Sequence, residues 1–170
     1  STPFPYPTLF RSMLAAERSA ARFSERGGTG VILRFAGLYG GDAMLRDMLR
    51  VARRGWAPLP GAAGAYWSSI AHADAASAVV AALDVPAGIY NVCDDEPVTR
   101  REFADVAAKA AGAAKPPRLM PTWVAALGGK TIELLSRSQR MTNRKLKDAS
   151  GWGPAWPSVR EGIPAAARHT

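Results

Sequence analysis

The stretch VILRFAGLYGGD, residues 31–42, decides the fold class of this chain. Its first five residues are apolar apart from Arg34, which is typical of a strand that is buried in a sheet. Glycines at residues 37–42 predict a turn, and apolar side chains at helical spacing over residues 43–54 predict a helix directly after it. Ligands of open α/β sheets bind beyond the carboxyl ends of the strands, so this turn is a candidate ligand site. The same glycines would also suit a tight turn that needs only positive φ angles.

The alternation of strands and helices continues on both sides of this stretch. Thr99 and Glu102 have the spacing of a capping box, and Asp74 is a candidate N-cap. Further strands are predicted over residues 66–70 and 88–93, and helices over residues 10–26, 74–83, 99–111, 121–135, 143–150 and 157–167. The pattern predicts an α/β layer fold with a mostly parallel sheet. Because so few strands make a thin sheet and no strand–glycine–helix unit comes first, we expect the back part of a larger protein.

Charge leaves two classes of partner open. The 170 residues include 22 Lys and Arg against 14 Asp and Glu, a net charge of +8, and 48% are hydrophobic, which excludes intrinsic disorder. A basic stretch, residues 137–147, suits phosphate groups of either a nucleic acid or a nucleotide-linked substrate. Aromatic side chains for base stacking are absent from this stretch, so nucleic acid is the less favoured partner.

Cysteine and hydropathy patterns bear on localisation. Cys93 is the one cysteine, which excludes an internal disulfide and favours a reducing cytoplasm. The longest uncharged stretch, residues 55–73, contains two prolines and several glycines and is unsuited to span a bilayer. We therefore expect a cytoplasmic protein without a membrane segment.

The first twelve residues, STPFPYPTLFRS, differ from the rest. Three prolines among the first seven positions favour an extended segment over a helix. The string also resembles a translated sequencing adapter, so residues 1–12 are interpreted as an artefact or a disordered segment. The alternative is a natural proline-rich loop ahead of a helix.

Three other groups of residues have simpler structural explanations. The glycines at residues 27–30 follow a helix and precede a strand, which is the wrong order for a phosphate loop. His72 and Asp74 have the chemistry of an acid–base pair, but a helix cap beside a backbone-bonded histidine explains them as well. The acidic run at residues 94–96 is interpreted as a solvated turn, since consecutive side chains seldom converge on a metal.

Four segments in order resemble the C-terminal half of the NAD-dependent epimerase/dehydratase family, the extended short-chain dehydrogenases/reductases. They are LRFAGLYGG (33–41), SSIAHADAASAVVAAL (68–83), GIYNVCDDEPVTRREFADVAA (88–108) and NRKLKDASGWGPAWPSVREGI (143–163). The resemblance covers residues 13–163 and leaves 164–170 as a tail. It implies a partial Rossmann-like parallel sheet with flanking helices, plus a small C-terminal α/β part that binds substrate.

The resemblance also implies roles for particular residues. The family holds NAD or NADP and often acts on nucleotide sugars. The loop Phe35, Ala36, Gly37 and Leu38 would lie near the nicotinamide, and Tyr39 near the substrate. From the basic stretch, Arg140 and Arg144 are the candidates for the phosphates of such a substrate.

Three departures from the family pattern limit these implications. The chain has no G-x-x-G-x-x-G fingerprint, and Leu9 and Met13 stand where the catalytic Tyr-x-x-x-Lys pair is expected. The usual H-V-D-D reads His72-Ala73-Asp74-Ala75, with one acid lost. The resemblance therefore implies an atypical member whose cofactor belongs to a longer parent protein. This chain alone is expected to be inactive, to bind a dinucleotide weakly or not at all, and to self-associate or form a homodimer. The rival classes are a basic nucleic-acid-binding module and a non-catalytic interaction domain on the same fold.

Overall fold

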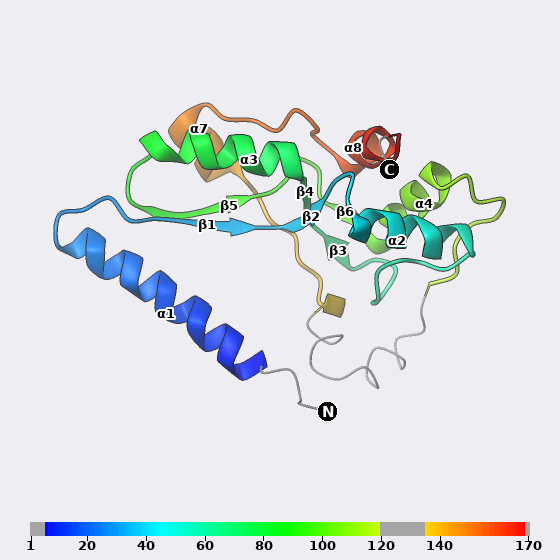
Figure 1. Cartoon of the computed structure of the whole chain (residues 1–170), viewed down its shortest axis with the longest axis horizontal. Coiled ribbons are helices and arrows are strands. Elements are labelled where there is room, and N and C mark those ends of the chain that lie inside the picture. The colour runs from blue at the N-terminus through cyan, green and yellow to red at the C-terminus, as the bar shows by residue number, and fades with distance from the viewer. Residues whose placement is uncertain (1–5, 120–134, 169–170) are drawn as a thin grey trace.

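Helices and strands alternate along the chain in a computed structural model, which describes residues 6–119 and 135–168 (Figure 1). The helices are α1 (Tyr6–Glu25), α2 (Ala43–Arg53), α3 (His72–Ala81) with a 3-10 turn (Ala82–Asp84), α4 (Arg100–Ala110), α7 (Arg144–Ser150) and α8 (Val159–Ala167). The strands are β1 (Val31–Phe35), β2 (Gly37–Tyr39), β3 (Tyr66–Trp67), β4 (Ser69–Ala71), β5 (Gly88–Val92) and β6 (Val98–Thr99). No helix of the described residues is long and apolar enough to cross a membrane.

The strands pair in three short ladders. β1 and β5 run parallel, with Val31 opposite Gly88 and Phe35 opposite Val92. β2 and β4 are also parallel, whereas β3 and β6 are antiparallel. Parallel pairs separated by helices confirm the predicted α/β fold, a partial Rossmann-like sheet with flanking helices.

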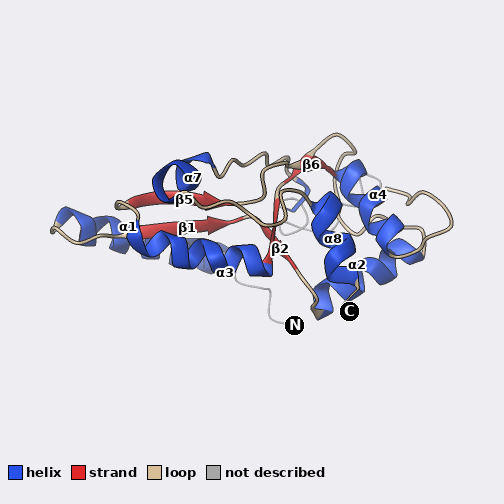
Figure 2. Cartoon of the chain, turned by 90° about the horizontal axis from the view of Figure 1, so that it is seen from above, coloured by secondary structure: helices blue, strands red, loops and turns tan. Residues whose placement is uncertain are grey.

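The helices form two groups at opposite ends of the molecule. In Figure 1, α3 and α7 cover one face of the β1–β5 pair and α1 lies on the other. Figure 2 shows α2, α4 and α8 gathered at the opposite end, around β2, β4 and β6. Each group has its own apolar core, one centred on Val92 and Leu146 and the other on Phe103 and Ile163.

β1 is a strand as predicted, but the expectation that it is buried is wrong. Val31, Ile32 and Leu33 are half-buried, and Arg34 and Phe35 are exposed. The reason is that β1 packs closely against helices on only one of its faces, the face toward α3 and α7.

Two helix starts differ from the predictions, and two further helix predictions concern Pro164 and residues 121–135. α1 begins at Tyr6, so residues 6–12 are helical; Pro7 is compatible with this because first-turn N–H groups have no intrahelical acceptor. α3 begins at His72, so Asp74 is not its N-cap but lies in its first turn. Pro164 lies inside α8, which continues to Ala167. The helix predicted over residues 121–135 falls almost wholly outside the described residues.

The capping-box prediction for α4 is confirmed. Thr99 accepts a hydrogen bond from the Glu102 backbone N–H, and the Glu102 carboxylate accepts from the Thr99 N–H at 2.8 Å. The backbone N–H of Arg100, the first residue of α4, donates to the carbonyl of Ala65 at 2.9 Å. The reciprocal cap and this bond fix the start of α4 beside β3.

Candidate functional site

One segment, residues 138–143, runs beside β3 and reaches the carboxyl end of β5. The Gln139 N–H donates to the carbonyl of Tyr66 at 3.0 Å, and the Met141 N–H donates to Ser68 Oγ at 2.9 Å. Asn143 Nδ2 then donates to the carbonyl of Cys93, the residue directly after β5, at 2.8 Å. The segment therefore borders the edge of the sheet at which α/β proteins bind ligands.

The turn predicted at residues 37–42 forms only at residues 40–42, because Gly37–Tyr39 are strand β2. Residues 35–38, called the 35–38 loop below, are therefore the end of β1, the link Ala36 and the start of β2, and they reach the same edge. The Ala36 N–H donates to the carbonyl of Val92 at 2.9 Å, and the Gly37 N–H donates to that of Ser68 at 3.1 Å. A Cβ at Gly37 would lie 2.7 Å from the Trp67 ring, so only glycine fits there. Phe35 and Leu38 remain 40% and 43% exposed. These two side chains offer apolar surface of the kind that an aromatic ring can contact.

Arg140 and Arg144 lie on the segment that borders this loop or directly after it. The guanidinium of Arg140 stands 4.9 Å from the centroid of the Tyr66 ring, a cation–π contact that orients the side chain. Arg144 opens α7 and is exposed. Neither arginine has an ion-pair partner in the described part of the chain, whereas Lys147 of the same basic stretch pairs with Asp95 at 2.9 Å.

Tyr39 is separated from the exposed Leu38 because alternate residues of a strand face opposite sides. It is 4% exposed, and its hydroxyl lies against Gly162 of α8. Burial, together with the carboxylates of Asp94 and Asp74, raises the pKa of the Tyr39 phenol. Tyr39 therefore belongs to the space between β2 and α8 rather than to the surface of the 35–38 loop.

The structure separates His72 from Asp74. The Asp74 carboxylate accepts the backbone N–H groups of Ala155 and Trp156, and His72 Nε2 lies 3.7 Å from Asp42 Oδ2 instead. The acid–base pair considered for His72 and Asp74 therefore does not form.

The prediction that the acidic run at residues 94–96 is a solvated turn holds for Asp95 and Glu96, which are exposed, but not for Asp94. Asp94 is buried, and its Oδ1 has no hydrogen-bond partner. Burial, followed by the charges of Asp95 and Glu96, raises the pKa of Asp94 to about 8. The burial of Asp94 could not be predicted from the sequence, because three consecutive acids give no indication of which side chain points into the protein. No cluster of three or more metal-ligating side chains occurs among the described residues.

The described residues do not fit the diphosphate of a dinucleotide. The glycine turn at residues 40–42 has the right order for a phosphate loop, but Asp42 caps α2 and accepts the Leu45 N–H at 2.8 Å. A carboxylate in that position repels a phosphate and occupies the amide that it would need.

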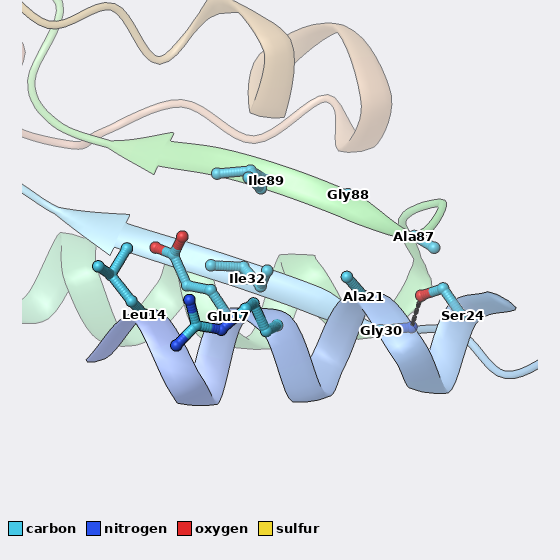
Figure 3. Close-up of a pocket in the computed structure, with 10 residues that line it drawn as sticks. Leu14, Glu17, Ala21, Ser24, Gly30, Ile32, Ala87, Gly88 and Ile89 are labelled. Carbon is cyan, nitrogen blue, oxygen red and sulfur yellow. Dashed lines mark hydrogen bonds between the residues drawn. The ribbon is translucent and has the colours of Figure 1, made fainter. Parts of the chain in front are cut away.

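An open apolar groove lies beside α1 on the uncovered face of the β1–β5 pair (Figure 3). It has a volume of about 420 Å³, and Leu14, Ile32 and Ile89 are among the side chains that line it. Glu17 and Arg34 attach α1 to β1 through two hydrogen bonds of 2.8 and 2.7 Å. The groove holds no candidate acid–base pair and is an incompletely covered sheet face.

One edge of β1 is also free within the described chain. The Gly30 carbonyl and the Ala36 N–H face β5, so the backbone groups of Val31, Leu33 and Phe35 face the opposite edge. Such an edge is a template for pairing with another strand.

Comparison with known proteins places this geometry in a family. No family model matches the chain. A Streptomyces protein, 3-diazoavenalumate denitrifying reductase, is 37% identical over 142 residues, 79% of this chain and 46% of that protein. UDP-N-acetylglucosamine 4-epimerase from Bacillus cereus matches 99% of this chain with a TM-score of 0.72 at 22% identity. UDP-glucose 4-epimerase from Thermus thermophilus, solved with NAD, matches 90% of this chain with a TM-score of 0.66 at 27% identity.

The chain shares its fold with NAD-dependent epimerases of the extended short-chain dehydrogenases/reductases. A human epimerase family protein, solved with NADPH, also matches 84% of this chain with a TM-score of 0.73 at 22% identity. The resemblance carried by the four sequence segments is thereby confirmed. This epimerase-like chain spans 56% of the Bacillus cereus chain and 50% of the human and Thermus chains.

Proposed function

We propose that this chain is the substrate-side part of an NAD(P)-linked reductase, epimerase or dehydratase. One observation carries the proposal: residues 138–143, which include Arg140, bond to Cys93 at the carboxyl end of β5 and to Ser68, whose carbonyl accepts the Gly37 N–H of the 35–38 loop. A nicotinamide wall and a cation at one sheet edge suit a small substrate that carries a phosphate beside its reacting carbonyl or hydroxyl.

Each side chain then has a role that its position supports. Residues Phe35, Ala36, Gly37 and Leu38 would hold the nicotinamide ring of NAD or NADP, which supplies or accepts hydride when bound. Arg140 and Arg144 would bind the diphosphate of a nucleotide sugar or a similar anionic substrate. Tyr39 stays a prediction on the substrate side, with access only from the space between β2 and α8.

The longer parent protein would supply the dinucleotide site that the described residues do not form. Met13 stands at one position of the missing Tyr-x-x-x-Lys pair and is an exposed residue of α1. We therefore propose that the chain alone is inactive. The Streptomyces relative is named as a reductase, which supports reduction as one chemistry of the parent.

Binding of nucleic acid is not favoured, since Lys145 and Lys147 contact Tyr90 and Asp95 of the chain itself.

The uncovered face beside α1 suggests self-association of the isolated chain. Met13 and Phe23 of α1 and Ile89 of β5 are exposed apolar residues, and β1 has a free edge beside them. Apolar patches and free edges of this kind favour association.

The thiol of Cys93 is buried, and burial raises its pKa to about 12. A free thiol suits a reducing compartment, and we propose the cytoplasm.

Calorimetric titration tests the substrate assignment. We expect UDP-glucose to bind the chain, and the double variant Arg140→Gln with Arg144→Gln to lose about tenfold or more in affinity. The pair Arg22→Gln with Arg26→Gln, exposed arginines in the last turn of α1 and directly after it, is the charge-matched control and should leave the affinity unchanged. Equal affinities for the double variant and the control would contradict the assignment. NADH should give no signal at micromolar concentration.

A further inference from the structure

Arg100, the first residue of α4, carries a charge that is buried in the fold. The residue is 1% exposed, and no carboxylate of the described residues forms an ion pair with it. Its Nε and Nη1 make no hydrogen bond. Burying such a charge costs free energy, and an apolar side chain of similar volume is often at least as stable in its place. Stability alone therefore does not account for this arginine.

The guanidinium of Arg100 contacts Trp67 of β3. Its Cζ lies over the Trp67 ring, 5.1 Å from the ring centroid, which is a cation–π contact. The same ring packs against Gly37, where an added Cβ would lie 2.7 Å from it. Gly37 belongs to the 35–38 loop, so a single side chain separates Arg100 from the loop that is proposed to hold the nicotinamide ring.

The same guanidinium also holds the chain that leads to Arg140. Its Nη2 donates hydrogen bonds to the carbonyls of Leu135 and Arg137, the second at 3.0 Å. Residues 135–137 lead directly into residues 138–143, the segment that carries Arg140. A guanidinium is planar and has its donors at fixed angles, so it fixes the direction of these two carbonyls more closely than a lysine ammonium would.

The backbone around Arg100 is itself fixed. The Arg100 N–H donates to the Ala65 carbonyl at 2.9 Å, and the capping box of Thr99 and Glu102 holds the first turn of α4. Gly61, with a φ of 118°, passes so close that an added Cβ would lie 2.7 Å from Arg100 Nε. The guanidinium is therefore a fixed point from which other groups can be positioned.

We propose that Arg100 is a positioning residue that holds the 35–38 loop and residues 138–143 in a fixed relation to each other. It contacts the first through Trp67 and the second through the carbonyls of Leu135 and Arg137. This inference rests on the proposed function, since these two segments are the two sides of the proposed site. Arg100 itself contacts neither cofactor nor substrate.

Amide hydrogen exchange, followed by NMR at single residues, tests the positioning. The Gln139 N–H is bonded to the Tyr66 carbonyl and reports on residues 138–143, whereas the Gly88 N–H, bonded to the Gly30 carbonyl, reports on the remote β1–β5 pair. In Arg100→Met we expect Gln139 to exchange about tenfold faster than in the unchanged chain, and Gly88 to keep its rate to within about threefold. Equal acceleration at both amides would mean general destabilisation and would overturn the proposal.

Arg101→Met is the matched control. Arg101 is the next residue of α4 and also donates to a carbonyl, that of Pro117 at 3.0 Å, but not to residues 135–137. This variant should leave the exchange of Gln139 unchanged. The same Gln139 rate in Arg100→Met and Arg101→Met would contradict the positioning role.

Arg100→Lys keeps the charge beside Trp67 and tests the proposal even if Arg100→Met does not fold. The ammonium lacks the planar fork, so we expect a Gln139 exchange rate that is several-fold above that of the unchanged chain. A rate equal to that of the unchanged chain would show that the guanidinium does not position the segment.

Calorimetric titration with UDP-glucose separates this inference from the proposed function. Arg100→Met should lower the affinity about tenfold without touching the ligand, and Arg101→Met should not change it. If the unchanged chain bound no UDP-glucose while Gln139 responded as expected, the proposed function would fail and the positioning by Arg100 would stand. Equal binding by the unchanged chain and Arg100→Met would overturn the positioning role.

Discussion

The carboxylate of Asp74 accepts the backbone N–H of Trp156 at 3.0 Å, across 82 positions of the sequence. Its other oxygen accepts the Ala155 N–H at 2.8 Å. Asp74 is buried, so this double acceptance fixes the loop before α8 against the first turn of α3.

Loss of this carboxylate should destabilise the fold. Asp74→Ala leaves two amides without their acceptor, and we expect it to lower the free energy of unfolding by about 2–4 kcal/mol. Urea denaturation followed by circular dichroism measures the change. Asp84→Ala, an exposed acid after α3, is the control and should cost about 0.5 kcal/mol or less. Equal midpoints for the two variants would show that the Asp74 bonds contribute little.

Asp94 should make stability fall as the pH rises. Its pKa is about 8 in the folded chain, above the ordinary value of 3.8. Between these two values the folded state holds a proton that the unfolded state has released, so unfolding becomes easier with increasing pH. The effect is absent below about pH 4 and complete above about pH 8.

Asp94→Asn isolates this contribution, because the amide keeps the shape of the carboxyl group and cannot ionise. We expect the melting temperature of the variant to exceed that of the unchanged protein at pH 8, and the difference to disappear near pH 4. Calorimetric scans at intervals of one pH unit measure it. Asp84→Asn should show no such trend, and a difference that stays constant with pH for Asp94→Asn would contradict the assignment.

Substitution by aspartate should have different effects on folding at two apolar residues of β5. Val92 is fully buried against α3 and α7, and Val92→Asp places a charge in that core and should abolish folding. Ile89 is 39% exposed on the face toward α1, so Ile89→Asp should fold and also reduce self-association. Soluble yield and analytical ultracentrifugation distinguish the outcomes. If both variants were insoluble, the face beside α1 would be covered rather than open.

Gly162→Ala should destabilise α8, against the usual preference of helices for alanine. The new Cβ would overlap Tyr39 Oη, and such overpacking costs about 1–3 kcal/mol. In the Tyr39→Phe background the overlap with the oxygen is gone, so the same change should cost less. A double-mutant cycle measured by urea denaturation gives the coupling. Additive effects would mean that the two groups do not meet.

Local patterns predicted the elements correctly where the deciding forces are local. The Thr99–Glu102 pair caps α4, because the two residues lie within a few positions of one another. The turn predicted from the glycine cluster after VILRF forms only at residues 40–42, because Gly37–Tyr39 pair with β4 as strand β2. The extended segment predicted from the prolines was wrong at the start of α1, since a first-turn proline displaces no hydrogen bond.

The sequence by itself determined the α/β alternation and the family resemblance, since apolar periodicity and short motifs can be read along the chain. Only the tertiary structure decided which polar groups meet. Asp74 binds amides 81 and 82 residues away, His72 faces Asp42, and Asp94 is buried while Asp95 forms an ion pair with Lys147. Burial and hydrogen bonding arise between elements that are distant in sequence, so residue types alone cannot distinguish a solvated acid from a buried one.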